Sequence, residues 1–373
     1  MSNSYFHRAN LADMFSRRSL SEKGASGIFI SSPRRTGKST FIREDLLPKL
    51  ESCGAEVIYV DLWADKSADP GEIIVAAIHK RIAATKSMVS GLIKKSGLDN
   101  ASIDVAGILK VGVSKKVREG EITITDSLSL LSENKKTIIV LVIDEAQHAT
   151  TTEQGANALF ALKAARDELN SSGNYGFRLI ATGSNRDKLA TLVNNKDHAF
   201  YGAPLVELPY LGRDFLEWEL SRFESDVKPS IERMLASFDL CGYRPEYLSQ
   251  SLDALLFQID LTGENVDSRL AVEVSNRLVA SKVDFLKQVN SLPPLQYSVL
   301  KVMAAEGDNF APFKSATIEK YKQVCGDLAE EVKIDSSSAQ AALESLRDKS
   351  LIWKVARSAY TLEDAQYAKW LIE

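Results

Sequence analysis

The segment SGIFISSPRRTGKSTFIREDLLPKLESCG, residues 26 to 54, constrains the fold more than any other part of the chain. It begins with a short apolar run, which is typical of a parallel strand buried on both faces. The residues from Ser39 onward have helical spacing, with four apolar side chains toward one face and a glycine as a stop. These residues are Phe41, Leu46, Leu47, Leu50 and Gly54. A strand that passes through a basic, glycine-containing loop into a helix predicts an α/β fold.

The loop between this strand and helix has the composition of a phosphate-binding site. Successive backbone N–H groups and the helix N-terminus attract phosphate oxygens. Lys38 would contact the β- and γ-phosphates of a nucleotide, the Ser39 hydroxyl would bind Mg²⁺, and Gly37 would let the backbone approach closely. The predicted nucleotide contacts are Ser32, Pro33, Arg34, Arg35, Thr36, Gly37, Lys38, Ser39 and Thr40, with Thr40 near the α-phosphate.

Ser32 occupies the position where the pattern G-x-x-x-x-G-K-[ST] has its first glycine. Pro33 favours an extended backbone at residue 32, and that conformation needs no positive φ. We therefore expect the serine to be tolerated. The sequence leaves open whether Arg34 and Arg35 are surface charges or contacts to a nucleotide or partner.

A second apolar run, TIIVLVIDEAQH at residues 137 to 148, ends in two adjacent acids. Its β-branched residues predict a strand buried on both faces, and ligands in open parallel sheets bind at the carboxyl ends of the strands. Asp144 is predicted to hold Mg²⁺ through water. Glu145 is predicted to orient and deprotonate the attacking water.

Three further strands are predicted at residues 55 to 63, 177 to 185 and 203 to 211. If the strand FRLIATGSN lies beside the acidic strand, Ser184 or Asn185 can reach the γ-phosphate and the water. The repeated order of strand, loop and helix predicts a parallel α/β sheet.

Composition restricts the class of protein further. The chain has 373 residues, 45% of them hydrophobic and 26% charged, as expected for a globular protein of two or three domains. The net charge of −4 provides no global basic field for nucleic acid. The three cysteines, Cys53, Cys241 and Cys325, are expected to be reduced and buried. We expect a cytoplasmic protein, because the sequence has no apolar run long enough for a membrane span and no signal peptide.

Four segments together resemble a known family: SSPRRTGKST, IIVLVIDEAQ, LIATGSN and LPYLGRDFLEW. They look like those of an AAA+-type P-loop ATPase, close to the archaeal-ATPase branch of the STAND and origin-initiator-like proteins. The resemblance extends from SYFHRANLADM near the N-terminus, which is similar to that family's adenine-side segment, to the C-terminus. It implies ATP or ADP and Mg²⁺ as ligands, and a helical lid after the sheet.

The resemblance also assigns a role to Arg244 and exposes one departure. The segment DLCGYRPEYLSQSLD matches the start of a lid helix in the family, so Arg244 would contact the phosphates. Family members often carry an arginine after YG, where a neighbouring subunit can use it, but this chain has Ala203 there. Arg186 and Arg213 do not occupy the matching position. A slow nucleotide switch therefore fits better than a fast ring motor.

These patterns predict three domains. Residues 1–211 would form the P-loop ATPase domain, 212–290 a helical lid and 291–373 a winged-helix domain. Within the first domain, residues 90–124 form the densest basic stretch and are predicted to contain short strands or a hairpin. This insertion could follow a nucleic-acid backbone or simply face water.

The C-terminal region is predicted to contain two helices, a third helix capped by Asp335 or Ser336, and a strand, tight turn, strand and helix. The apolar face of the capped helix contains Ala339, Ala342, Leu343 and Leu346. This pattern resembles a winged helix-turn-helix. Its exposed face offers Ser337, Ser338, Gln340, Glu344, Arg347 and Lys349, with Lys354 and Arg357 on the wing. That is a modest set for reading DNA, and a protein-docking role stays open.

The sequence thus predicts a Mg²⁺–ATP-hydrolysing switch and leaves two classes of function open. In one, nucleotide state controls assembly on DNA, through the winged helix or the basic insertion. In the other, it gates a protein partner or a homo-oligomer without DNA, as in signalling or phage-defence ATPases.

Overall fold

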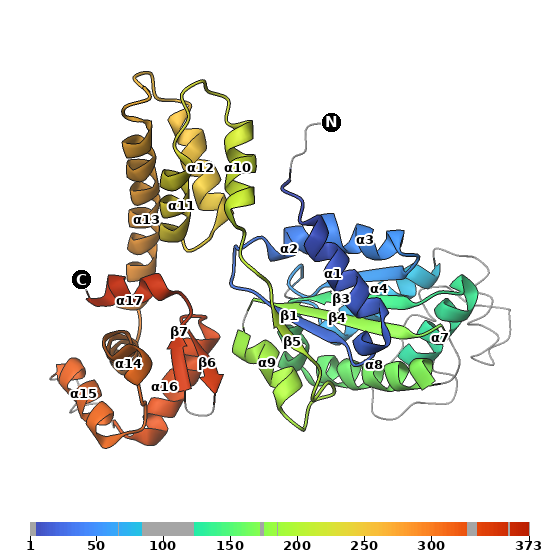
Figure 1. Cartoon of the computed structure of the whole chain (residues 1–373). Coiled ribbons are helices and arrows are strands. Elements are labelled where there is room, and N and C mark those ends of the chain that lie inside the picture. The colour runs from blue at the N-terminus through green and yellow to red at the C-terminus, as the bar shows by residue number, and fades with distance from the viewer. Residues whose placement is uncertain are drawn as a thin grey trace. The chain divides into compact units, whose positions relative to one another are not determined.

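The computed structural model describes residues 5–65, 67–83, 123–171, 175–184, 186–326, 334–356 and 359–372 (Figure 1). The chain divides into two compact units. The first runs to Pro209, and the second begins at Tyr210 and also includes the short stretch Arg35–Gly37. Of the basic segment 90–124, residues up to 122 lie outside the described residues, so the predicted hairpin stays a prediction.

The first unit contains a five-stranded parallel sheet in the order β2-β3-β4-β1-β5. The strands are β1 (Ile28–Ser31), β2 (Glu56–Asp61), β3 (Ile139–Asp144), β4 (Phe177–Gly183) and β5 (Leu205–Glu207). The predicted parallel α/β sheet is confirmed. The strand β4, which leads into the GSN segment, lies beside β3, which ends in the acidic pair, as the predicted site requires. Every residue of β1, β3 and β4 is buried, which explains their continuous apolar runs.

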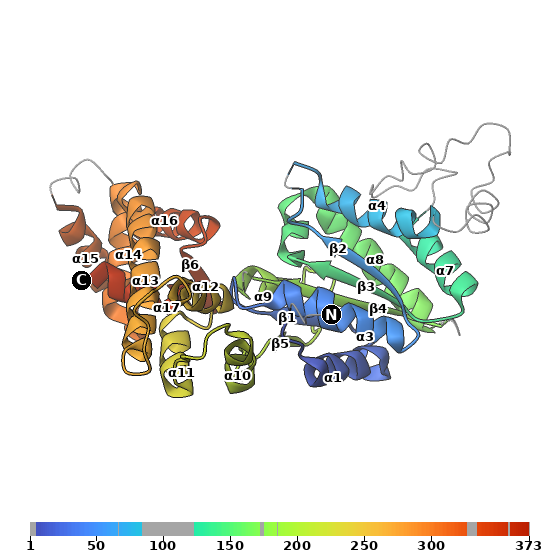
Figure 2. The same ribbon diagram turned by 90° about the horizontal axis from the view of Figure 1, so that it is seen from above.

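Helices cover both faces of this sheet (Figure 2). Successive side chains of a strand point to opposite faces, so Phe29 packs into one core while Ile28 and Ile30 pack into the other. One face is covered by α1 (Ala9–Leu20) and by the helical turns after the loop. The other is covered by α4 (Pro70–Ala83), α7 (Ile124–Lys135), α8 (Glu153–Ser171) and α9 (Arg186–Asn194).

The helix after the loop is predicted as one piece but has three parts. These are α2 (Lys38–Phe41), a π-helical turn η2 (Ile42–Leu46) and α3 (Leu47–Ser52). Pro48 lies at the start of α3 and has no N–H for a regular helical hydrogen bond. The wider turn before it, in which the Leu47 N–H donates to the Ile42 carbonyl, accommodates this missing donor.

Thr123 and Ile124, the end of the segment predicted as an insertion, belong to a helix start instead. Thr123 caps α7 in a reciprocal box, since its hydroxyl accepts from the Asp126 N–H while the Asp126 carboxylate accepts from the Thr123 N–H. Thr123 and Ile124 therefore do not belong to the predicted insertion, and its other residues lie outside the described part of the chain.

The second unit begins with four helices, α10 (Arg213–Arg222), α11 (Ile231–Leu240), α12 (Pro245–Leu255) and α13 (Val266–Asn290). It continues with α14 (Pro294–Glu306), α15 (Ser315–Cys325), α16 (Ser336–Asp348), the antiparallel strands β6 (Ile352–Ala356) and β7 (Ala359–Leu362), and α17 (Ala365–Ile372). Asp335 caps α16, because its carboxylate accepts from the Ser338 N–H at 2.9 Å. The four predicted apolar residues of α16 are buried.

One expectation about the cysteines is wrong. Cys241 and Cys325 are buried, but Cys53 is exposed because it follows the last turn of α3, beyond the face that packs on the sheet. Among the described residues, no helix is both long and apolar enough to cross a membrane.

Candidate functional site

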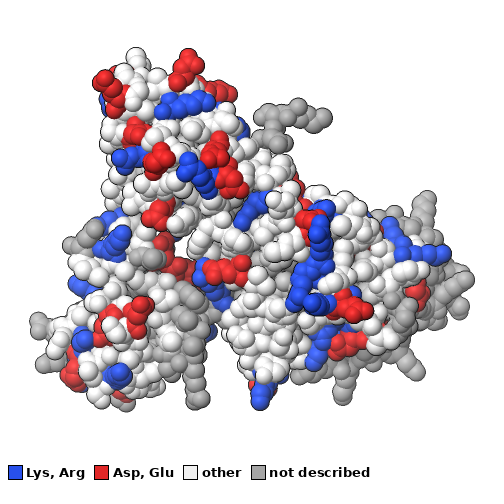
Figure 3. All heavy atoms as spheres, viewed as in Figure 1, with Lys and Arg blue, Asp and Glu red and all other residues white. Residues whose placement is uncertain are grey.

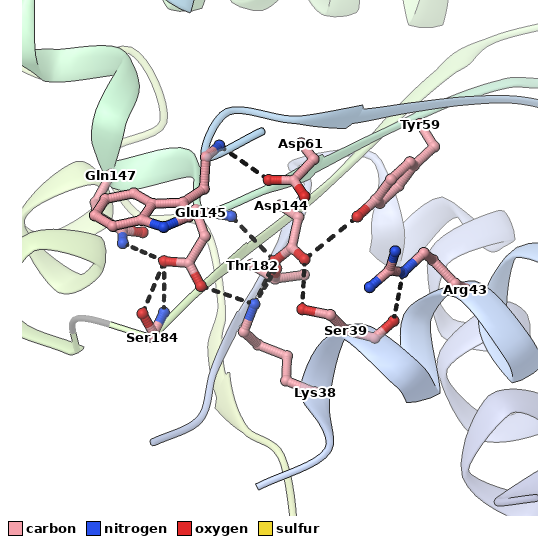
Figure 4. Close-up of polar contacts among 11 residues, drawn as sticks. Lys38, Ser39, Arg43, Tyr59, Asp61, Asp144, Glu145, Gln147, Thr182 and Ser184 are labelled. Atoms are coloured by element: carbon pink, nitrogen blue, oxygen red, sulfur yellow. Dashed lines mark hydrogen bonds and ion pairs between the residues drawn. The ribbon is translucent and has the colours of Figure 1, made fainter. Parts of the chain in front are cut away.

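Polar side chains from four sequence segments meet at the carboxyl edge of the sheet (Figure 4). Lys38, the first residue of α2, is buried and contacts both acids at the end of β3. Its Nζ pairs with Asp144 Oδ1 and lies 3.1 Å from Glu145 Oε1. Thr182 and Ser184 come from the end of the neighbouring strand β4. The structure thus brings together Lys38, Ser39, Asp144, Glu145 and Ser184, which the sequence analysis selected.

Asp144 is the most heavily bonded group of this cluster. Ser39 Oγ donates to its Oδ2 at 2.8 Å, Thr182 Oγ1 donates to Oδ1, and the Tyr59 hydroxyl lies 3.4 Å from Oδ2. Burial favours the neutral acid, but the charge of Lys38 and these hydrogen bonds outweigh it and hold the pKa of Asp144 below its usual value. The carboxylate is therefore charged while it is shielded from water.

Glu145 has a left-handed backbone, with φ 57° and ψ 41°, where the chain leaves β3. A non-glycine residue in this conformation costs about 1 kcal/mol or more, and such strain is typical of functional sites. Its Oε2 accepts from Ser184 Oγ at 2.8 Å and from Gln147 Nε2 at 2.6 Å. Burial again opposes the charge, and Lys38, Ser184 and Gln147 together keep the pKa of Glu145 low.

The loop keeps a regular backbone at Ser32. Ser32 is buried, its N–H donates to the Gly183 carbonyl at 3.2 Å, and its φ is not positive, as Pro33 predicts. The left-handed residues of the loop are Arg35 and Gly37, with φ of 65° and 88°. Arg34 lies over the Trp63 ring at 5.7 Å, so within the first unit its charge contacts an aromatic face.

Sequence reasoning missed three contributors: Tyr59, Gln147 and Thr182. Thr182 is a polar residue inside an apolar strand, next to the position where β3 and β4 pair Ile143 with Ala181. Tyr59 precedes Asp61 by two positions, on the same face of β2. Thr182 and Tyr59 could have been noticed in the sequence as polar residues near the end of a buried apolar run. Their contact with Asp144 can be inferred only when the strand order is known.

Arg244 lies in the second unit, where it precedes α12 as its N-cap residue. Its guanidinium pairs with Asp364, just before α17, and lies over the Tyr247 ring at 5.3 Å. The predicted contact of Arg244 with phosphates stays a prediction.

Asn185 and Arg357 lie outside the described residues, and the side chain of Lys354 is not described.

The oxygen atoms at this edge fit Mg²⁺. Ser39 Oγ and the Asp144 carboxylate are 2.8 Å apart, and Mg²⁺ in nucleotide sites typically takes one or two protein oxygens and keeps several waters. Among the described residues, no group of three or more histidine, cysteine or acidic side chains could hold a metal ion, so a cage built by the protein alone is not formed there.

Comparisons with known proteins bear on the fold. No family model matches the chain, and no curated protein matches its sequence. The structure is similar to a Walker-type ATPase of Pyrococcus abyssi, with a TM-score of 0.57 and 18% identity over 100% of this chain and 97% of that one. It is also similar to the ADP form of the ORC2 protein of Aeropyrum pernix, with a TM-score of 0.58 and 14% identity over 100% and 95%.

At these identities the likeness establishes the fold alone. The chain shares the α/β fold of these two solved structures, in agreement with the fold that the sequence resemblance implied. It extends over nearly the whole length of both solved structures.

Proposed function

We propose that this protein is a Mg²⁺–ATP-dependent switch that hydrolyses ATP slowly and couples its nucleotide state to assembly on DNA or with a partner. The observation that carries the proposal is Lys38, a buried lysine at the start of a helix that pairs with the buried Asp144 carboxylate and the partly buried Glu145 carboxylate. A cation bound this way is available to a phosphate group that replaces the carboxylates as its partner.

Each residue then has a role toward the substrate. Lys38 binds the β- and γ-phosphates, while residues of the loop from Ser32 to Thr40, other than Pro33, supply backbone N–H groups around them. Ser39 directly, and Asp144 through water, would hold Mg²⁺, which would neutralise phosphate charge. Glu145 takes a proton from the attacking water, and Ser184 holds the Glu145 carboxylate in place.

The preference for ATP is supported by the solved structures with this fold, since forms of the Aeropyrum pernix ORC2 protein contain ADP and ADPNP. The slow rate rests on Ala203. Its side chain packs in the apolar core of the first unit, at the position where the family resemblance expects an arginine.

Coupling to the rest of the chain is supported by contacts inside the second unit. We propose residues 212–290 as a lid and 291–373 as a winged-helix domain. Arg244 of the lid pairs with Asp364, and Gln366 Nε2 donates to the Leu240 carbonyl. These contacts tie the lid helices to the C-terminal end. An arginine shared between Asp364 and phosphates would transmit the nucleotide state to that end.

A protein partner without DNA is the second candidate. In α16, Gln340 donates to Glu344, and Lys349, the C-cap residue directly after this helix, donates to Ser345, so both side chains already have partners in α16. Positive and negative residues are also interspersed over α10–α13 on the face shown in Figure 3. Such a surface favours protein docking over the electrostatic attraction that dominates DNA binding.

The test is ATP turnover by the purified protein, with and without duplex DNA, for the parent and for Glu145→Gln. Turnover that DNA stimulates and Glu145→Gln removes supports the DNA-linked switch. Turnover that ignores DNA but still depends on Glu145 supports the partner-gated form. Equal turnover by both proteins would defeat the assignment of Glu145 as the base.

A further inference from the structure

Gln147 is a buried polar residue that neither the loop nor the acidic pair explains. Its side chain is 2% exposed, in a 3-10 turn, η3 (Ala146–Thr151), that follows directly from the left-handed Glu145. The reversal at Glu145 turns the chain so that Gln147, two residues later, faces back toward the carboxylate. Its Nε2 donates to Glu145 Oε2 at 2.6 Å (Figure 4). A carboxylate can only accept, so the amide nitrogen must face it.

The space that Gln147 occupies depends on Gly183 at the end of β4. A methyl group at Gly183 would overlap Gln147 Oε1 and crowd the Leu189 side chain at 3.2 Å. The φ of Gly183 is not in the left-handed region, so its backbone does not require glycine. The glycine is therefore explained by the close approach of the Gln147 amide.

The side-chain amide of Gln147 does not by itself stabilise the folded protein. Within the described residues its Oε1 is buried and accepts no hydrogen bond. Burying an unsatisfied polar atom costs about 1–3 kcal/mol. An apolar side chain of similar length would avoid that cost, so the glutamine is better explained by what its donor does to Glu145.

We propose that Gln147 is a positioning residue: together with Ser184 it fixes Glu145 Oε2, so that Oε1 faces the attacking water. The inference rests on the proposed hydrolysis with Glu145 as base. In the structure the Oε1 atom contacts Lys38 Nζ at 3.1 Å. When Lys38 turns to the phosphates, Oε1 loses that partner while Oε2 keeps Gln147 and Ser184.

In the resulting hydrolysis step, every bond that forms is matched by one that breaks. The water oxygen forms a bond to the γ-phosphorus, the bond from that phosphorus to the ADP oxygen breaks, and one water proton passes to Glu145 Oε1. The Gln147 amide exchanges no proton. It restricts the carboxylate to one orientation, and misplacing a reacting group by about 1 Å can cost about 100-fold in rate.

The experiment compares the parent with Q147M, E145Q and the double variant Q147M/E145Q in single-turnover ATP hydrolysis, with ATP affinity measured in parallel. Methionine keeps the length and apolar stem of glutamine but has no donor. For Q147M we expect a rate about 10-fold lower or more, with unchanged ATP affinity. In the E145Q background the same change should have no further effect, because Gln147 acts only through Glu145.

A second variant tests the same contact from the other strand. G183A should slow hydrolysis as Q147M does, because its methyl group displaces the amide. In a Q147A background, where the side chain is gone, G183A should cost little more. Thermal unfolding of each variant shows whether it is folded.

The outcomes separate this inference from the proposed function. A parent-like rate in Q147M, beside a slow E145Q, overturns the inference and leaves the proposed function standing. An equal loss from Q147M in both backgrounds also overturns it, since Gln147 would then act elsewhere. A parent-like rate in E145Q overturns the base assignment and this inference with it.

Discussion

The two units of the chain bury polar side chains in different ways. In the first, Lys38, Asp144 and Thr182 are buried together at one edge of the sheet and bond to residues distant in sequence. Among the described residues from Tyr210 onward, the buried polar side chains are hydroxyls. Two of them, Ser251 and Ser298, donate to carbonyls four residues earlier in their own helices.

This difference supports the proposal that the first unit carries the nucleotide site. Burying a charge is costly unless it is paired, so a cluster of buried charges is retained for a reason beyond packing. Hydroxyls that bond within their own helix need no such reason. We therefore expect substitutions at the sheet edge to alter function, and substitutions of the buried hydroxyls in the second unit to alter stability at most.

The largest contrast should come from two partly buried glutamates, Glu145 and Glu219. Glu145→Gln should lower the turnover of ATP about 100- to 10,000-fold while ATP still binds, because the amide cannot accept the water's proton. Glu219 is the matched control in the second unit, where burial raises its pKa and Ser249 donates to it. Glu219→Gln should leave turnover unchanged. Similar losses in both variants, measured by phosphate release, would break the comparison.

A lysine pair gives the next contrast. Lys38→Ala should weaken ATP binding by about 100-fold or more, since it removes a charged contact to phosphate and leaves the Asp144 and Glu145 carboxylates without their cation. Lys49→Ala is the control, because Lys49 pairs with Asp13 at a half-exposed position. Titration with a fluorescent ATP analogue measures both. Retained affinity in Lys38→Ala would remove the central argument for a nucleotide site.

Thr182→Val should cost about 1–2 kcal/mol of unfolding free energy at neutral pH, because Asp144 loses a buried hydrogen bond. The pKa of Asp144 is lowered in the folded protein, so this contribution is present above the unfolded value of about 3.9 and disappears as pH falls through the folded pKa. Ser251→Ala, which removes a bond within one helix, should cost less. Denaturant melts across pH would contradict the assignment if the Thr182→Val loss persisted unchanged in acid.

The smallest effect is expected from the Arg244–Asp364 pair, whose side chains are 18% and 11% exposed. Arg244→Asp or Asp364→Arg should each lower the unfolding free energy of the second unit by about 1 kcal/mol, and the double exchange should restore part of it. If Arg244 also contacts phosphates, Arg244→Asp alone should weaken ATP binding. Loss without recovery in the double exchange would mean that the pair is not a specific contact.

Local sequence was sufficient wherever a residue's role depends on its neighbours in the chain. The buried strands, the capped helix α16 and the non-glycine Ser32 followed from apolar runs, a capping residue and Pro33. The exposed Cys53 was mispredicted, because a residue's place past the end of a packed helix depends on how that helix lies on the sheet.

The sequence by itself determined the class of fold and selected Lys38, Ser39, Asp144 and Glu145 as the candidate site, because a loop before a helix and acids after a buried run have strong local signatures. Only the tertiary structure decided that β4 lies next to β3, which places Thr182 and Ser184 against the acids. It also decided that Gly183 makes room for Gln147. The physical reason is that contacts between parallel strands depend on strand order and register, and no single segment encodes either.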